Sequence, residues 1–217
     1  MKDKKKYLIE VIVIIFSILA AFWLDQKAED FENTKKERQY LKLLKTDLIE
    51  DSTNLSFLIS YYDKKNLSRK ILIENLPGTD LSNDSLTTLI RGTMGFIPFA
   101  ASTETFKSIH ASGDLYIIRS DLIKIKYMKL ITKYETSNSY AVQSFLPIIY
   151  DYGLNRWPVF MNVDKMVVDQ KNKLYDKEEI DYLAMAQLGT NFHLDYLRKN
   201  LNGCLEVLSL VSQEIEN

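Results

Sequence analysis

The first 76 residues contain neither glycine nor proline, and the first break is the Asn-Leu-Pro-Gly stretch at 75–78. Glycine and proline are the residues that most often interrupt a helix. A chain that lacks both over this distance is expected to remain helical until proline and glycine together stop it. This feature favours an all-α fold built on one long amino-terminal helix.

The segment 7–24 is apolar except for Glu10 and Ser17, and it follows a tail, residues 1–6, that carries four lysines. Eighteen helical residues span about 27 Å, close to the hydrocarbon thickness of a bilayer. The segment therefore predicts a transmembrane helix. Because lysines stay on the cytoplasmic side, we expect the tail in the cytoplasm and the bulk of an inner-membrane protein in the periplasm.

A cleaved signal peptide is the alternative interpretation of this beginning. The apolar run is longer than a typical signal core, and no small-x-small cleavage site follows it. Phe22 and Trp23 stand where interfacial anchors are expected. We therefore predict an uncleaved signal-anchor with the lipid bilayer as its surroundings.

The remaining chain divides into a polar helical stalk at 25–39 and a periplasmic domain at 40–217. Apolar residues in the domain recur at spacings of three, four and seven, as in coiled coils and helical bundles. The pattern predicts an antiparallel helical bundle that follows the long first helix. The recurring residues are Leu41, Leu44, Leu48, Leu55, Leu58 and Tyr62, then Ile123, Tyr127, Leu130, Tyr134, Ala141 and Phe145, and finally Leu194, Leu197, Leu201, Leu205, Leu208, Val211 and Ile215.

Local signals divide the domain further. We expect a short helix at 84–92, a helix that Ser102 caps and Gly113 ends, and a third that runs from Ser120 to Pro147. An irregular segment with a short strand at 166–169 would follow, and Asp176 would begin the last helix.

Composition excludes several functional classes. The net charge is −1 overall and +2 over residues 1–24, so the exported part carries about −3 and offers no basis for nucleic-acid binding. Cys204 is the only cysteine, so no intramolecular disulfide can form, and we expect it to be a small core residue.

Motifs for catalysis, cofactors or metals are absent from the sequence. The only histidines are His110, expected at the end of a helix, and His193, expected to pack at the start of one. Asp47, Glu50 and Asp51 are expected to form a solvated acidic face, because one helix offers too few ligands for magnesium or calcium. We predict a protein that is not an enzyme and binds no cofactor or metal.

A glycine- and proline-containing loop at 92–101 carries the apolar residues Met94, Phe96, Ile97 and Phe99. Such a loop either docks on a partner or folds over the end of the bundle. The bundle is also rich in tyrosine, which would line a ligand pocket or pack in the core.

Two motifs resemble an uncharacterised family of small single-span membrane proteins common in Bacteroidota. The resemblance covers the first half of the chain and implies membrane localisation without a known activity. The matching residues are Tyr40, Leu41, Leu44, Asp47, Leu48 and Asp51 in the first motif, and Thr105, Phe106, Ser108, Ser112 and Gly113 in the second.

Three interpretations of Glu10 remain open. It pairs with Lys6 at the interface, it joins Ser17 and Ala21 on one packing face of the span, or it handles protons. The packing face is favoured, because these residues share a stripe at about 100° per residue.

The sequence thus predicts a membrane-anchored, non-enzymatic interaction module or accessory subunit, with a second copy or another membrane protein as partner. A periplasmic ligand-binding sensor that signals through a partner is the alternative. An enzyme of unknown class is the third and weakest hypothesis.

Overall fold

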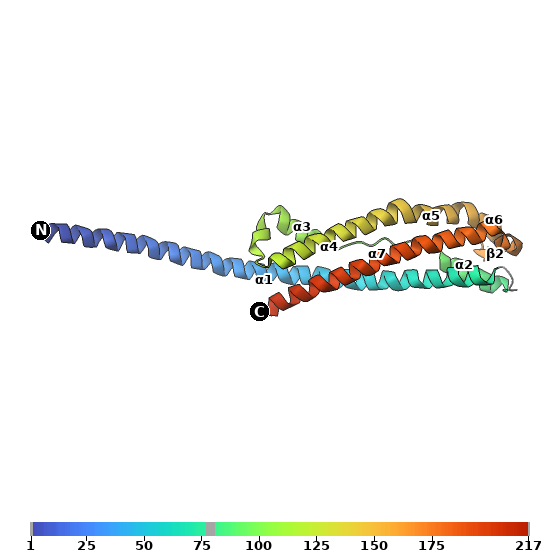
Figure 1. The fold of residues 1–217 in the computed structure, drawn as a ribbon, viewed down its shortest axis with the longest axis horizontal. Coiled ribbons are helices and arrows are strands. Elements are labelled where there is room, and N and C mark those ends of the chain that lie inside the picture. The colour runs from blue at the N-terminus through green and yellow to red at the C-terminus, as the bar shows by residue number, and fades with distance from the viewer. Residues whose placement is uncertain (1, 77–80, 217) are drawn as a thin grey trace.

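The computed structural model describes residues 2–76 and 81–216. For residues 2–9 and 11 it describes the backbone alone. The described chain is almost entirely helical, which confirms the all-α prediction (Figure 1). Its α-helices are α1 (Lys2–Asn75), α2 (Asn83–Thr93), α3 (Glu104–Ala111), α4 (Asp121–Tyr140), α5 (Leu146–Asp151), α6 (Trp157–Phe160) and α7 (Lys177–Glu216).

Helix α1 is 74 residues long, about 110 Å at 1.5 Å per residue. Its first part stands clear of every other element, and its second part forms one side of the bundle (Figure 1). Helix α7 runs back along α1, while α4 to α6 run in the same direction as α1. The predicted antiparallel bundle on a long first helix is therefore present.

One face of α1 is buried along its entire contact with the bundle, and we call this face the α1 seam. Its spacing alternates strictly between four and three residues, the heptad pattern that keeps one stripe facing a partner helix. The predicted leucine stripe lies on it, and so do Asp51, Lys65 and Arg69. The seam residues are Glu37, Leu41, Leu44, Leu48, Asp51, Leu55, Leu58, Tyr62, Lys65, Arg69, Leu72 and Leu76.

The stripe predicted for the third helix is buried from Ile123 to Phe145. The stripe predicted for the last helix is wrong at Leu205, which is about half exposed, because Cys204 and Val207 occupy the buried face instead. As expected, Cys204 is a core residue, and its thiol contacts the carbonyl oxygen of Leu48 at 3.2 Å.

The predicted helix end at Pro147 is wrong, because the helix continues through a π-turn, η2 (Ala141–Phe145), into α5. A second π-turn, η3 (Tyr152–Arg156), precedes Pro158 in the same way. Proline lacks an N–H and crowds the carbonyl four residues back, and a π-turn rearranges that part of the ladder. In both turns the following N–H reaches five residues back, from Leu146 to Ala141 and from Trp157 to Tyr152.

Residues 152–160, predicted to be irregular, are therefore helical. The predicted short strand is present as β2 (Val167–Val168), which pairs antiparallel with β1 (Met161–Asn162). Two 3₁₀ turns complete the described elements, η1 (Asp114–Ile117) and η4 (Lys171–Tyr175). Gly113 ends α3 in the left-handed region as predicted, whereas Thr103 and not Ser102 begins that helix.

Hydrogen bonds join the start of the first family motif to the segment that follows the second motif. The Tyr40 hydroxyl donates to Asp114 at 2.5 Å. Near it, the buried Glu37 accepts the Arg119 amide at 2.6 Å. These bonds attach the segment after α3 to the first turns of the α1 seam.

Among the residues whose side chains the structure describes, no helical stretch is long and apolar enough to cross a membrane. The predicted span 7–24 includes residues 7–9 and 11, whose side chains lie outside that part. The span stays a prediction.

Candidate functional site

The segment after α2 is extended and passes between the long helices. Phe99 is buried in the main core, against the ring of Tyr134. The Tyr62 hydroxyl donates to the Ile97 carbonyl at 2.9 Å and accepts its amide at 3.0 Å. This part of the predicted docking loop is therefore folded into the bundle, which leaves Met94 and Phe96 half-buried at its edge.

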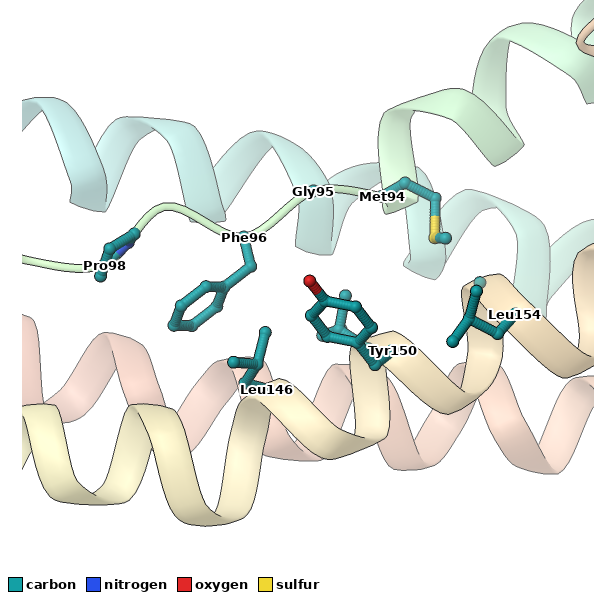
Figure 2. A pocket seen from close by; sticks show the side chains of 9 residues that line it. Met94, Gly95, Phe96, Pro98, Leu146, Tyr150 and Leu154 are labelled. Carbon is teal, nitrogen blue, oxygen red and sulfur yellow. The ribbon is translucent and has the colours of Figure 1, made fainter.

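A pocket of about 430 Å³ lies between this loop and the helix opposite. Figure 2 shows Phe96 extending toward Leu146 and Met94 lying above Leu154. The volume falls in the range of roughly 300–1,000 Å³ that is usual for ligand sites. The lining residues are Met94, Gly95, Phe96, Pro98, Leu146, Ile149, Tyr150, Gly153 and Leu154.

The wall opposite the loop is built by α5 and η3. Its side chains come from the short helix between the two π-turns and from the second turn itself. π-turns occur often at functional sites, because they re-aim side chains within an otherwise regular helix. Gly153 allows the loop to approach, since a Cβ there would lie 2.7 Å from Met94 Cε.

Two buried cations lie on α1 behind this loop. Lys65 and Arg69 are 6% and 1% exposed. The Arg69 guanidinium donates to Thr190 Oγ1 and to the Thr93 carbonyl, both at 2.6 Å. The Lys65 ammonium lies over the ring of Tyr61, 4.3 Å from its centroid. Within the described chain, neither cation forms an ion pair with a carboxylate.

Gly95 connects the cations with the pocket. Its φ of +98° is a conformation that favours glycine. A Cβ at this position would lie 2.5 Å from the Tyr61 hydroxyl and 3.4 Å from Lys65 Nζ. The residue that lines the pocket on one side therefore contacts both polar groups directly.

Burial, and secondly the charge of Arg69, lowers the pKa of Lys65 to about 8. Burial likewise lowers the pKa of Arg69 to about 10. Both shifts have the same physical cause, a positive charge that is removed from water without a negative partner. The site therefore favours an added negative charge.

An aromatic cluster of the main core surrounds His193. His193 is fully buried in the middle of α7 and not at a helix start, where we expected it. Its ring lies 4.8 Å from that of Tyr62 and 5.2 Å from that of Phe145. Among the described residues neither ring nitrogen has a hydrogen-bond partner, and burial lowers the pKa of His193 to about 4.

The predicted solvated acidic face is wrong at Asp51. Asp51 is buried and accepts the Ser102 amide, while Glu50 is exposed. In the described parts of the chain no cluster of potential metal ligands occurs. His110 lies in the last turn of α3 as expected.

The predicted packing face of the span lies on the free part of α1. Glu10, Ser17 and Ala21 are all exposed. The Ser17 hydroxyl donates to the Val13 carbonyl of its own helix at 2.8 Å. No other element of the bundle reaches this face (Figure 1).

A second hollow of about 520 Å³ lies between α5 and the start of α7. Three carboxylates line it, from Asp151, Glu178 and Asp181. Tyr182 donates a hydrogen bond to Asp151 at its edge. None of the residues that line this hollow is buried, so the first pocket is the stronger candidate.

Sequence reasoning missed Lys65 and Arg69. The signal that identifies them is the heptad spacing of the seam, which continues from Tyr62 through both cations to Leu72. A long basic side chain at a heptad position where a leucine is expected is a candidate functional residue.

No family model, curated protein or solved structure matches this chain. The function is therefore argued from the chain's own residues.

Proposed function

We propose that this protein is a membrane-anchored, non-enzymatic interaction module, or an accessory subunit of a membrane complex. The observation that carries the proposal is a bare apolar surface on α1 at 12–24. Its large apolar side chains are each about half or more exposed, from Ile12 at 49% to Phe16 at 72%. A helix that is apolar all round requires an apolar environment, such as lipid or a partner helix.

The placement of charges supports insertion with the amino end in the cytoplasm. Four lysines lie within residues 1–6. At the other end of the apolar surface Lys27 lies over the ring of Trp23, 5.9 Å from its centroid. Tryptophan and lysine are common where a helix leaves the membrane. The same helix then enters the bundle without a break, so the anchor holds the bundle off the lipid.

The chemistry of the buried groups supports a non-enzymatic role. Burial raises the pKa of the Cys204 thiol to about 11, so the thiolate is a negligible fraction at neutral pH. The buried His193 is held neutral among aromatic rings, where no substrate reaches it. These buried groups contribute to the packing of the bundle.

Extraction and labelling test the anchor and its orientation. The full chain should stay with membranes after alkaline carbonate treatment. In the Lys64→Cys variant, a membrane-impermeant maleimide should label intact spheroplasts, whereas the buried Cys204 of the native chain should not react. Release by carbonate, or labelling only after lysis, would contradict the proposal.

Crosslinking in intact membranes tests the interaction role. We expect a crosslinked second copy or a neighbouring membrane protein. A strictly monomeric protein without a crosslinked neighbour would exclude this role and leave only the anchor.

A periplasmic ligand-binding module is the second candidate function. The apolar pocket of about 430 Å³ between the loop and α5 favours it. Thermal-shift screening against ligand classes tests this candidate.

A further inference from the structure

We propose that the pocket beside Gly95 binds a single-chain amphiphile with a carboxylate head, a fatty acid. Its apolar chain would occupy the pocket, and its head would lie beside Gly95, across which Lys65 and Tyr61 lie. This inference rests on the second candidate function and names its ligand class.

The first argument is the uncompensated charge. Lys65 and Arg69 are four residues apart on α1, which places them on the same helix face. Both are more than nine-tenths buried. A buried charge is costly unless an opposite charge or several hydrogen bonds stabilise it. The hydroxyl and carbonyl oxygens around Arg69 are neutral, so a bound anion would supply the missing charge.

The second argument is the set of free donors. In the part of the chain that is described, the Lys65 ammonium and the Tyr61 hydroxyl form no hydrogen bond with any protein group. Both lie against Gly95, at 3.4 and 2.5 Å from the position of a Cβ. Gly95 separates both donors from the pocket, so a carboxylate head beside this glycine would lie near a positive charge that has no anionic partner.

The third argument is the shape and chemistry of the pocket. Apart from the glycines and the Tyr150 hydroxyl, its lining side chains are hydrocarbon or thioether groups. Figure 2 shows them arranged in two facing rows along the loop and α5, which suits an extended chain. An apolar groove with a buried cation behind its wall at Gly95 is complementary to an amphipathic anion.

The test uses the full chain in phosphatidylcholine nanodiscs and a photoreactive 12-carbon carboxylate. After irradiation, labelled peptides are mapped by mass spectrometry, and labelling is competed with dodecanoate or with dodecanol. We expect labels in residues 94–98 and 146–154. Dodecanoate should compete, and dodecanol should compete at least about tenfold more weakly.

The variants separate the head site from the chain site. Lys65→Met should weaken dodecanoate competition at least about tenfold, while the exposed Lys64→Met on the same helix leaves it unchanged. Leu154→Trp should abolish labelling by filling the pocket. If Lys65→Met lowers the melting temperature of the protein, the competition is measured with the Lys65→Gln variant.

Each outcome decides the proposal. Equal competition by dodecanol and dodecanoate, with no effect of Lys65→Met, would overturn the carboxylate head but keep an apolar ligand site. If no label maps to the pocket at any concentration, the inference is excluded, and the second candidate function is decided by the thermal-shift screen against other ligand classes. The membrane anchor is tested separately by extraction.

Discussion

The backbone amide of Ser102 donates a hydrogen bond of 2.7 Å to the carboxylate of Asp51, a seam residue with no exposed surface. The bond joins the end of the extended segment to the middle of α1. The second oxygen of Asp51 has no hydrogen-bond partner among the described residues, and burial raises the pKa of this carboxyl. A polar residue within an apolar seam thus positions the segment that forms one wall of the pocket.

Replacing Asp51 separates its hydrogen bond from its charge. Asp51→Asn keeps an acceptor for the Ser102 amide, so the melting temperature should remain close to that of the native protein. Asp51→Ala leaves this amide without an acceptor and should cost about 1–3 kcal/mol of unfolding free energy. Asp47→Ala on the same helix is the control, with an expected change within about 0.5 kcal/mol. If Asp51→Ala is as stable as the native protein, the hydrogen bond contributes nothing to the free energy of unfolding.

His193 should make the protein sensitive to acid. Its pKa is about 4 in the fold and 6.5 when unperturbed, so protons bind the unfolded chain first. Its contribution to stability is complete above pH 6.5 and declines as the pH falls to about 4, by about 3 kcal/mol. Melting temperatures measured across this range should show the decline.

The variant His193→Phe should lose this part of the pH dependence, because it cannot be protonated and fits an aromatic cluster. His110→Phe is the matched control and should keep it, since His110 is exposed. If the melting temperatures of the native protein and of His193→Phe depend on pH in the same way, His193 is not the cause of the acid sensitivity.

The ion pair of Arg156 and Glu179 should show strong coupling. Arg156 Nε lies 2.6 Å from a Glu179 oxygen, and the Glu179 side chain is 1% exposed. Burial raises the pKa of Glu179, and the charge of Arg156 opposes that rise. Arg156→Met should therefore cost about 3–5 kcal/mol, because it leaves a buried carboxylate unpaired.

A double-mutant cycle measures this coupling by chemical denaturation. The double variant Arg156→Met, Glu179→Met should recover most of the loss. Glu178→Ala removes the exposed partner of Arg156 and should cost under about 1 kcal/mol. Additive effects of the single substitutions would mean that the pair is not coupled.

The predicted packing face of the span can be tested by cysteine crosslinking at Ser17. Two Ser17→Cys chains should crosslink in membranes if Glu10, Ser17 and Ala21 form an interface. Ala21→Leu should prevent the crosslink, because a bulky side chain keeps the helices apart. Glu10→Gln should reduce it less, since an amide still forms a hydrogen bond worth about 1 kcal/mol.

An unchanged crosslink in Ala21→Leu would exclude this interface and favour Glu10 at the membrane edge, paired with a lysine. If Glu10→Gln abolishes the function of the protein in cells while the crosslink remains, the proton-handling interpretation is favoured instead. The native chain, whose only cysteine is buried, is the control for background crosslinking.

The sequence by itself determined the helical class and most of the buried stripes. Helix propensity and heptad spacing are properties of neighbouring residues, so the absence of glycine and proline before Pro77 and the leucines from Leu41 to Leu58 were sufficient. The stop at Gly113 and the cap at Ser120 are equally local. These features needed no knowledge of what lies across the bundle.

Only the tertiary structure decided the role of the polar seam residues and the path of the chain past Pro147. The partner of Asp51 lies 51 residues away, and Arg69 finds its hydrogen-bond acceptors at the end of α2 and on α7. A proline ends an isolated helix, but packing of α5 against α7 stabilises a π-turn that carries the helix onward. Burial of a charge, and the pocket beside it, depend on contacts between segments far apart in the sequence, which local propensity does not encode.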